Sequence, residues 1–311
     1  MSHHHRPTTP LILAPVLALL LVACSGSGAS TPPTGDGTAP PATPGGVPQE
    51  SPGPSAPLGE IEHATGATDI LLRYDEGGGF IMPAFTAAMT PHFTLYGDGT
   101  IVYRDPGLEG PPAQGSAFLM NPLLTAKLTE AHIQELLAFA LGEGGLAAAR
   151  PEYRNDMVAD ASTAMFTIHA GGIEKTVSVY ALGMDGEGVP DLPARAAFGR
   201  LAERLLTLGN GGLLEVSDYQ PAAYRVTLFE SPGVVAPDLR AWPWDDIAVA
   251  DFQPAGDPNG PPFPFTVMTS EQVAELGVTD FTGGFQNLVI TGSDGVLYTM
   301  AVRPLLPGES R

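Results

Sequence analysis

The chain of 311 residues has little cysteine and little positive charge. Its one cysteine, Cys24, excludes a disulfide within the chain and any zinc site that needs two thiolates. Only 14 lysines and arginines accompany 34 aspartates and glutamates, for a formal charge of −20. Nucleic-acid binding needs a basic surface that displaces counterions from phosphate, and charge-based attachment to anionic lipid needs clustered lysine and arginine. The composition therefore excludes nucleic acid as an expected partner, and it excludes a polybasic membrane contact.

Residues 1–24 have the three-zone order of a secretory signal peptide. A polar start that contains Arg6 precedes an apolar run from Leu11 to Ala23. A membrane-spanning helix needs roughly 20 apolar residues, and this run is shorter. We therefore expect the segment to be cleaved rather than to remain as a span.

The apolar run ends in Leu21-Val22-Ala23-Cys24, which resembles the lipobox of bacterial lipoproteins. The resemblance implies that residues 1–23 are removed and that Cys24 becomes the new N-terminus, with a diacylglyceryl group on its thiol and a further fatty-acyl chain such as palmitate. Each buried CH₂ contributes about 0.8 kcal/mol, so two or three acyl chains hold a protein firmly. The alternative is an ordinary signal peptide with a chance cysteine near the cut.

Lipid on Cys24 would attach the protein to the cell membrane, with the rest of the chain facing the exterior. In a cell with two membranes, attachment to the outer membrane stays open, because Ser25 follows the cysteine where an aspartate would favour retention at the inner membrane.

Residues 24–58 consist mostly of Pro, Gly, Ser, Thr and Ala, and Asp36 and Glu50 are their only charges. Such a segment cannot bury enough apolar surface to offset the entropy lost on ordering. We predict a disordered tether with a root-mean-square span of roughly 30 Å. An O-glycosylated stalk has the same composition and is the alternative.

Residues 59–311 predict an α+β fold of antiparallel hairpins with two or three packed helices. Dipeptides that favour two-residue turns occur at Asp98-Gly99, Gly171-Gly172 and Asp294-Gly295. Such turns would place Leu95 opposite Val102, and Phe166 opposite Val177. The chain forms either one large domain or two halves, 59–209 and 210–311, with the glycines at 209–212 as the boundary.

Three helices are expected from capping residues and apolar spacing. The first begins at Thr129 and stops at Gly142, and the second runs from Asp191 to the glycines at 209–212. The third begins at Thr269, where Gln272 completes a capping box.

No catalytic or metal-binding motif is present, so we assign no catalytic residue, no metal ligand and no cofactor. His-Glu-x-x-His, Gly-x-Ser-x-Gly and Walker patterns are missing from the sequence. The pairs His132/Glu135 and His169/Glu174 are more typical of solvated surfaces than of catalytic or metal-binding sites. Calcium stays an alternative for two acidic loops that lack EF-hand spacing: Asp185, Glu187 and Asp191, and Asp245, Asp246 and Asp251.

Two segments allow a functional or a structural interpretation. Trp242-Pro243-Trp244 could stack on a sugar ring, but large aromatic residues more often fill a core or a seam between domains. The acidic, glycine-rich segment from Asp75 to Phe80 could gate a site, but a plain connector is the commoner case.

We therefore expect an envelope lipoprotein whose acidic domain binds a protein or small-molecule ligand without catalysing a reaction. The central and C-terminal segments resemble uncharacterised bacterial lipoproteins, which implies no activity. One alternative is an envelope hydrolase, which should present a concave site with two or more buried carboxylates of raised pKa. The other is the solute-binding subunit of a transporter, but such subunits are usually two-lobed α/β proteins.

Overall fold

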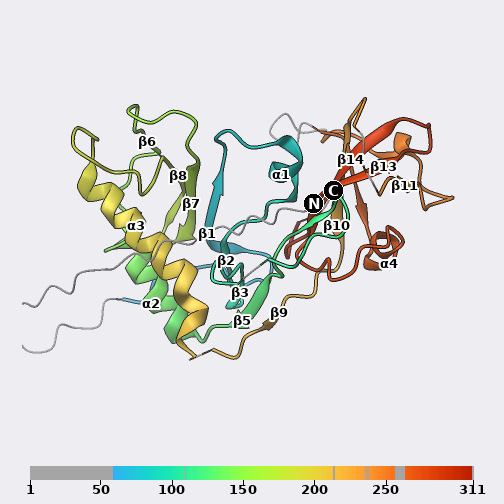
Figure 1. Cartoon of the computed structure of the whole chain (residues 1–311). Helices are drawn as coiled ribbons and strands as arrows, with labels where there is room; N and C mark the ends of the chain where they lie inside the picture. Colours follow the sequence, from blue (N-terminus) through green and yellow to red (C-terminus); the bar gives the residue numbers. More distant parts are fainter. Residues whose placement is uncertain are drawn as a thin grey trace, which may run out of the picture. The chain divides into compact units, whose positions relative to one another are not determined.

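The structure is a computed structural model that describes residues 59–108, 110–212, 214–234, 236, 238–255 and 263–309. These residues belong to one compact unit, Pro57–Arg311. The described part contains two mostly antiparallel sheets and four α-helices, so the predicted α+β class is confirmed (Figure 1). The predicted signal peptide (1–23), the lipid-attachment residue Cys24 and the predicted tether (24–58) lie outside the described residues.

An eight-stranded sheet has the order β6-β8-β7-β1-β2-β3-β5-β9, and only the pair of β6 and β8 is parallel. Its strands are β1 (Ile70–Gly77), β2 (Phe93–Tyr96), β3 (Thr100–Tyr103), β5 (Leu124–Lys127), β6 (Glu152–Tyr153), β7 (Thr163–Ala170), β8 (Ile173–Tyr180) and β9 (Ser217–Asp218). Helices α2 (Glu130–Leu141) and α3 (Leu192–Thr207) cover one face of this sheet (Figure 1), and the 3₁₀-helix η1 (Leu208–Gly211) follows α3.

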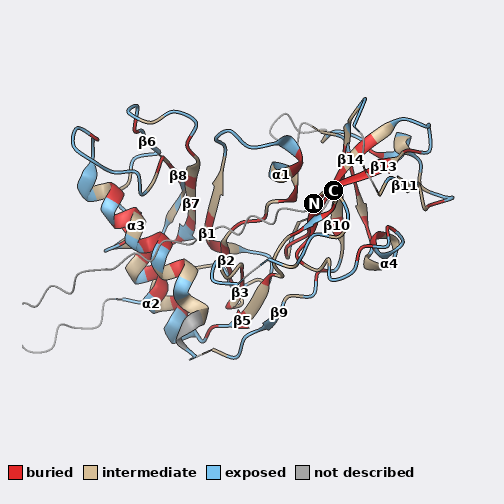
Figure 2. Ribbon diagram, viewed as in Figure 1, coloured by how far each residue is buried: buried red, intermediate tan, exposed pale blue. Residues whose placement is uncertain are grey.

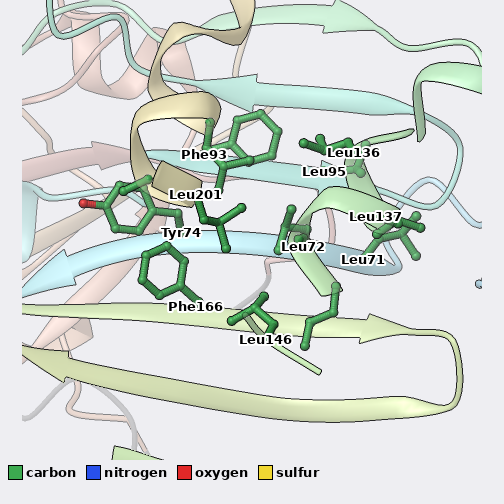
Figure 3. Close-up of a cluster of buried hydrophobic side chains, with 14 of the residues drawn as sticks. Leu71, Leu72, Tyr74, Phe93, Leu95, Leu136, Leu137, Leu146, Phe166 and Leu201 are labelled. Atoms are coloured by element: carbon green, nitrogen blue, oxygen red, sulfur yellow. The ribbon is translucent and has the colours of Figure 1, made fainter. Parts of the chain in front are cut away.

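The main core lies between this sheet and its two helices. Side chains alternate between buried and accessible positions along β7, as expected for a strand with one covered face. Figure 3 shows the packed cluster of leucine and aromatic side chains from both layers: Leu71, Leu72, Tyr74, Phe93, Leu95, Leu136, Leu137, Leu146, Phe166 and Leu201.

A six-stranded sheet has β11-β13-β14-β10-β12 as its main order, and β4 also pairs with β13. Its strands are β4 (Phe118–Leu119), β10 (Tyr224–Glu230), β11 (Arg240–Ala241), β12 (Phe265–Met268), β13 (Phe285–Thr291) and β14 (Leu297–Pro304). Helix α1 (Pro83–Ala88) packs Ala84 and Ala88 against Ala301 of β14. The remaining short elements are η2 (Val249–Asp251) and α4 (Ser270–Ala274).

The two sheets exchange short strands across the predicted boundary at 209–212. β4 comes from the segment 59–209 but pairs with β13, whereas β9 comes from 210–311 but pairs with β5. The division into halves stays a prediction.

Of the expected hairpin registers, one is confirmed and one is wrong by a residue. Phe166 lies opposite Val177, so Gly171-Gly172 forms the two-residue turn. Leu95, however, lies opposite Ile101 rather than Val102. The turn there has three residues, because Gly97 joins Asp98 and Gly99 in the loop and Gly99 takes a φ of 85°. The hairpin at Asp294-Gly295 has the same three-residue form.

The three expected helices are present. The Thr129 hydroxyl accepts a hydrogen bond from the His132 amide at the start of α2, and Gly142 ends that helix. Thr269 and Gln272 form the expected capping box of α4. The short helix α1 was missed, since six residues give no clear apolar period. Within the described residues, no helix has the length and apolarity needed to cross a membrane.

The first described residues bind at the turn between β7 and β8. The Glu62 carbonyl accepts a 2.8 Å hydrogen bond from the Gly171 amide. The Gln134 side chain bonds both main-chain groups of Ile61, and His63 Nε2 lies 3.0 Å from Glu130 Oε1. Helix α2 thus fixes the start of the domain at this end of the sheet.

Candidate functional site

A pocket of about 500 Å³ opens at the far end of β1, where that strand extends beyond its neighbour β2. Residues Asp75, Glu76 and Gly77 pair with β7 but have no partner on β2. The pocket is lined by β1 and the residues that follow it, by the region of α1 and by β7: Asp75, Glu76, Gly77, Gly78, Thr86, Met89, Thr163 and Met165.

The Glu76 carboxylate is the centre of a polar cluster on one side of this strand end. The Ser162 hydroxyl donates to Glu76 Oε1, and the Tyr74 hydroxyl donates to Oε2 over 3.2 Å. His92 Nε2 lies 3.9 Å from the same Oε2, and its ring stacks on Tyr74 at 5.3 Å between centroids. Burial lowers the pKa of His92, although the charges of Glu76 and Asp75 oppose this shift. His92 is therefore neutral at neutral pH.

Burial raises the pKa of the neighbouring Asp75 carboxyl. A hydrogen bond from the Glu76 amide to Asp75 Oδ1, 2.8 Å long, and the positive charges of Arg73 and Arg303 partly offset the effect. Asp75 thus has a carboxyl group that accepts a proton more readily than an exposed aspartate, at the wall of a pocket.

The two carboxylates are poorly arranged for concerted hydrolysis. Consecutive residues of a strand direct their side chains to opposite faces of the sheet. Hydrolysis by paired carboxylates requires both groups to flank one bond. Ser162 donates to Glu76, whereas a nucleophilic serine is normally paired with a histidine that takes its proton. The arrangement suits recognition by charge and hydrogen bonding.

Three loops lie at the same end of the eight-stranded sheet as the pocket, and we call them the loop rim: residues 78–82, 154–162 and 181–190. Gly79 touches the second loop, since a Cβ added to it would lie 2.9 Å from the carbonyl oxygen of Asp160. Asn155, which is fully buried, joins the second loop to the third. Its Nδ2 donates to the Met184 carbonyl over 2.8 Å, and its Oδ1 accepts from the Met157 amide over 3.1 Å.

Large apolar side chains are exposed on the loop rim. Phe80 is 93 % exposed, Met157 75 %, Met82 59 % and Met184 54 %. Figure 2 shows the loop between β1 and α1 and the loops around β6 mostly in the colour of exposed residues. The segment from Asp75 to Phe80, for which the sequence favoured a plain connector over a gate, lines a pocket with its first residues and ends in an exposed apolar tip.

The acidic and histidine pairs singled out in the sequence lie apart from this pocket. His132 is exposed and Glu135 forms an ion pair with Arg204. His169 lies opposite Glu174 next to the β7–β8 turn, and both are exposed. No three His, Cys, Asp or Glu side chains in the described part are placed to hold a metal ion.

The acidic loop at Asp185 belongs to the third segment of the loop rim and continues to Asp191, and two of its carboxylates have arginine partners. Asp185 pairs with the buried Arg195, and Asp191 pairs with Arg150. These ion pairs hold the loop against α3 and the strands beneath it.

Trp242 and Trp244 belong to the core of the six-stranded sheet. Their rings meet edge to face at 5.0 Å, and Trp244 Nε1 donates to the Gln272 carbonyl over 2.9 Å. Burial against this sheet is the structural interpretation that the sequence favoured, although the contact lies within one core rather than at a domain seam.

Sequence reasoning missed Ser162, His92 and Asn155. Strand pairing across about ninety positions brings Ser162 to Glu76, and no local pattern encodes that contact. A usable signal was present nearby, because Phe80-Ile81-Met82 stands between three glycines and a proline and so predicts an apolar loop tip.

No protein-family model matches the chain, and no curated protein or solved structure matches it.

Proposed function

We propose that the protein is a lipid-anchored binding module whose extracytoplasmic domain takes a ligand at the pocket beside β1. The observation that carries the binding role is the loop rim, where large apolar side chains stand exposed at the end of the sheet where the pocket opens. Exposed apolar groups gathered at one place are typical of interaction sites. The anchor is supported by Leu21-Val22-Ala23-Cys24 at the end of the apolar run.

The variant Cys24→Ser tests the anchor. Without the thiol no diacylglyceryl group can be attached, so the variant should leave the membrane fraction for the soluble fraction. Wild-type protein after detergent extraction is the control for folding. Unchanged membrane association of the variant would rule out the lipid anchor.

A photo-crosslinking amino acid at single exposed positions tests the site. At Phe80 and Met157 of the loop rim we expect adducts in intact cells. Leu239, which is 50 % exposed outside the loop rim, is the matched control and should give none. Equal adducts at all three positions, or adducts at Leu239 alone, would place binding elsewhere.

An envelope hydrolase is the second candidate, and the raised pKa of Asp75 favours it. A carboxyl group with a raised pKa is better suited to act as a general acid than one with its ordinary pKa. Turnover of glycoside, ester or peptide substrates that is lost in Asp75→Asn would support this candidate over binding alone. A solute-binding subunit has less support, because the sheets are mostly antiparallel rather than two α/β lobes.

A further inference from the structure

We propose that the loop rim binds a cationic polypeptide segment that carries apolar side chains between its lysines or arginines. This inference rests on the proposed binding function and specifies the class of ligand at the same site.

The exposed apolar side chains of the loop rim are mostly methionines. Three of the four large apolar side chains that are more than half exposed on the loop rim are methionines, at positions 82, 157 and 184, and the fourth is Phe80. Methionine is flexible and polarisable, so surfaces rich in it adapt to apolar side chains of different shape. A partner that covers these groups must itself present apolar side chains.

The charge of the loop rim indicates which charge its partner should carry. The loop rim contains four carboxylates, Asp156, Asp160, Asp185 and Glu187, and a single arginine, Arg154. Asp185 pairs with Arg195 and Asp156 pairs with Arg154, whereas Asp160 and Glu187 are exposed and have no ion pair among the described residues. A negatively charged surface of this kind attracts cations and repels anionic lipid and nucleic acid.

The loop rim is also held in place, which lowers the cost of binding. Asn155 joins two of its loops through the 2.8 Å hydrogen bond to the Met184 carbonyl, and Gly79 packs on the carbonyl of Asp160. A surface that is ordered before binding loses less conformational entropy on association. The pocket of about 500 Å³ has room for a side chain of the partner, and the Asp75 carboxyl group on its wall suits an ammonium or guanidinium group.

The test uses the full chain with Cys24→Ser, which needs no detergent, and a defined probe. The probe is a fluorescein-labelled amphipathic peptide of leucine and lysine, about 18 residues long. The same peptide with glutamate in place of lysine is the probe control. Fluorescence anisotropy in about 150 mM salt measures affinity where long-range attraction is screened.

Matched variants separate the loop rim from the general acidity of the chain. Asp156→Asn/Asp160→Asn/Glu187→Gln removes three charges from the loop rim, and Asp245→Asn/Asp246→Asn/Glu275→Gln removes three exposed charges elsewhere. Phe80→Ser/Met157→Ser removes apolar groups from the loop rim, with Leu239→Ser/Val296→Ser as its counterpart at other exposed sites.

We expect the lysine peptide to bind, the glutamate peptide not to bind, and each loop-rim variant to weaken binding about tenfold or more. The counterpart variants should change affinity less than about twofold. Equal losses in both sets would mean that only net charge is sensed and would overturn the proposal. No peptide binding, together with crosslinks at Phe80, would overturn the ligand class but keep the proposed function; crosslinks absent as well would overturn both.

Discussion

At the scale of single residues, the Arg303–Glu309 pair binds the C-terminal segment to β14. Arg303 is 8 % exposed, and its Nη1 donates to Glu309 Oε2 over 2.9 Å. The Leu306 amide donates to the same oxygen over 3.0 Å. Burial alone would raise the pKa of Glu309, but the charge of Arg303 and these hydrogen bonds lower it below its ordinary value. The carboxylate therefore stabilises the fold in its ionised form.

The variant Glu309→Gln should lower the free energy of unfolding at pH 7 by about 2–3 kcal/mol, since it leaves the buried Arg303 without its counter-charge. Because the folded pKa is lowered, the stabilisation is present above the ordinary pKa of about 4.5 and is lost as the pH falls through the folded value. Urea unfolding of both proteins from pH 7 to pH 3 should thus show a difference that shrinks toward acid. A difference that grows at low pH would contradict this assignment.

At the scale of elements, the two Asp-Gly turns share one backbone form but differ in their surroundings. Gly99 and Gly295 have φ values of 85° and 80°. A Cβ at Gly99 would lie 2.5 Å from the Leu128 carbonyl oxygen, whereas a Cβ at Gly295 would meet nothing within 4 Å. The Leu128 amide in turn donates to the Gly99 carbonyl, so this turn also fixes the start of α2.

Replacing each of these two glycines by alanine separates two losses of stability. One comes from the positive φ, and the other comes from the contact with the Leu128 carbonyl. Gly295→Ala should cost about 1–2 kcal/mol, the penalty for a left-handed conformation with a side chain. Gly99→Ala should cost clearly more, because the carbonyl of Leu128 must also move. Chemical denaturation of both variants measures the difference. Equal losses of unfolding free energy in the two variants would mean that the main chain at Leu128 can move without a loss of stability.

Interactions between residues close in sequence made the helices and one hairpin predictable. The length of the other turns and the order of the strands depend on residues farther away. Thr129, Gly142, Thr269 and Gln272 act within a turn of their own helix, so their roles can be derived from the sequence. Asp-Gly fits both two- and three-residue loops, and here the third residue is Gly97, which has no side chain to resist joining the loop. The place of β1 between β7 and β2 depends on pairing with residues far along the chain.

The candidate site was predictable only in part for the same reason. The segment from Asp75 to Phe80 stood out by composition, because acidic and glycine residues precede an apolar tip. Its pocket needs Thr163 and Met165 from β7 and Thr86 and Met89 near α1, which only the folded chain brings together.

At the scale of the whole molecule, the folded domain carries nearly all of the negative charge. Residues 60–311 contain 32 carboxylates and 13 lysines and arginines. Repulsion among so many like charges destabilises a compact state, and dissolved salt screens it.

Raising sodium chloride from about 10 mM to about 500 mM should therefore raise the thermal midpoint of the full chain, because the screening length falls below the spacing of most surface charges. Scanning calorimetry at both salt concentrations measures the shift. Potassium chloride at the same ionic strength is the control and should give the same shift. A fall in the midpoint would mean that attractive pairs such as Arg204–Glu135 outweigh the repulsion.

Hydrogen bonds to Gly171 and to α2 fix the position of residues 61–63 on the domain. Strand β7 ends next to these residues, and it begins at Thr163 on the wall of the pocket. Its eight residues separate the two points by about 25 Å, at roughly 3.3 Å per residue. If Cys24 carries the proposed lipid, the chain from the membrane joins the domain at the first point. The attachment then lies at the end of β7 opposite the pocket, which leaves the loop rim free to meet a ligand.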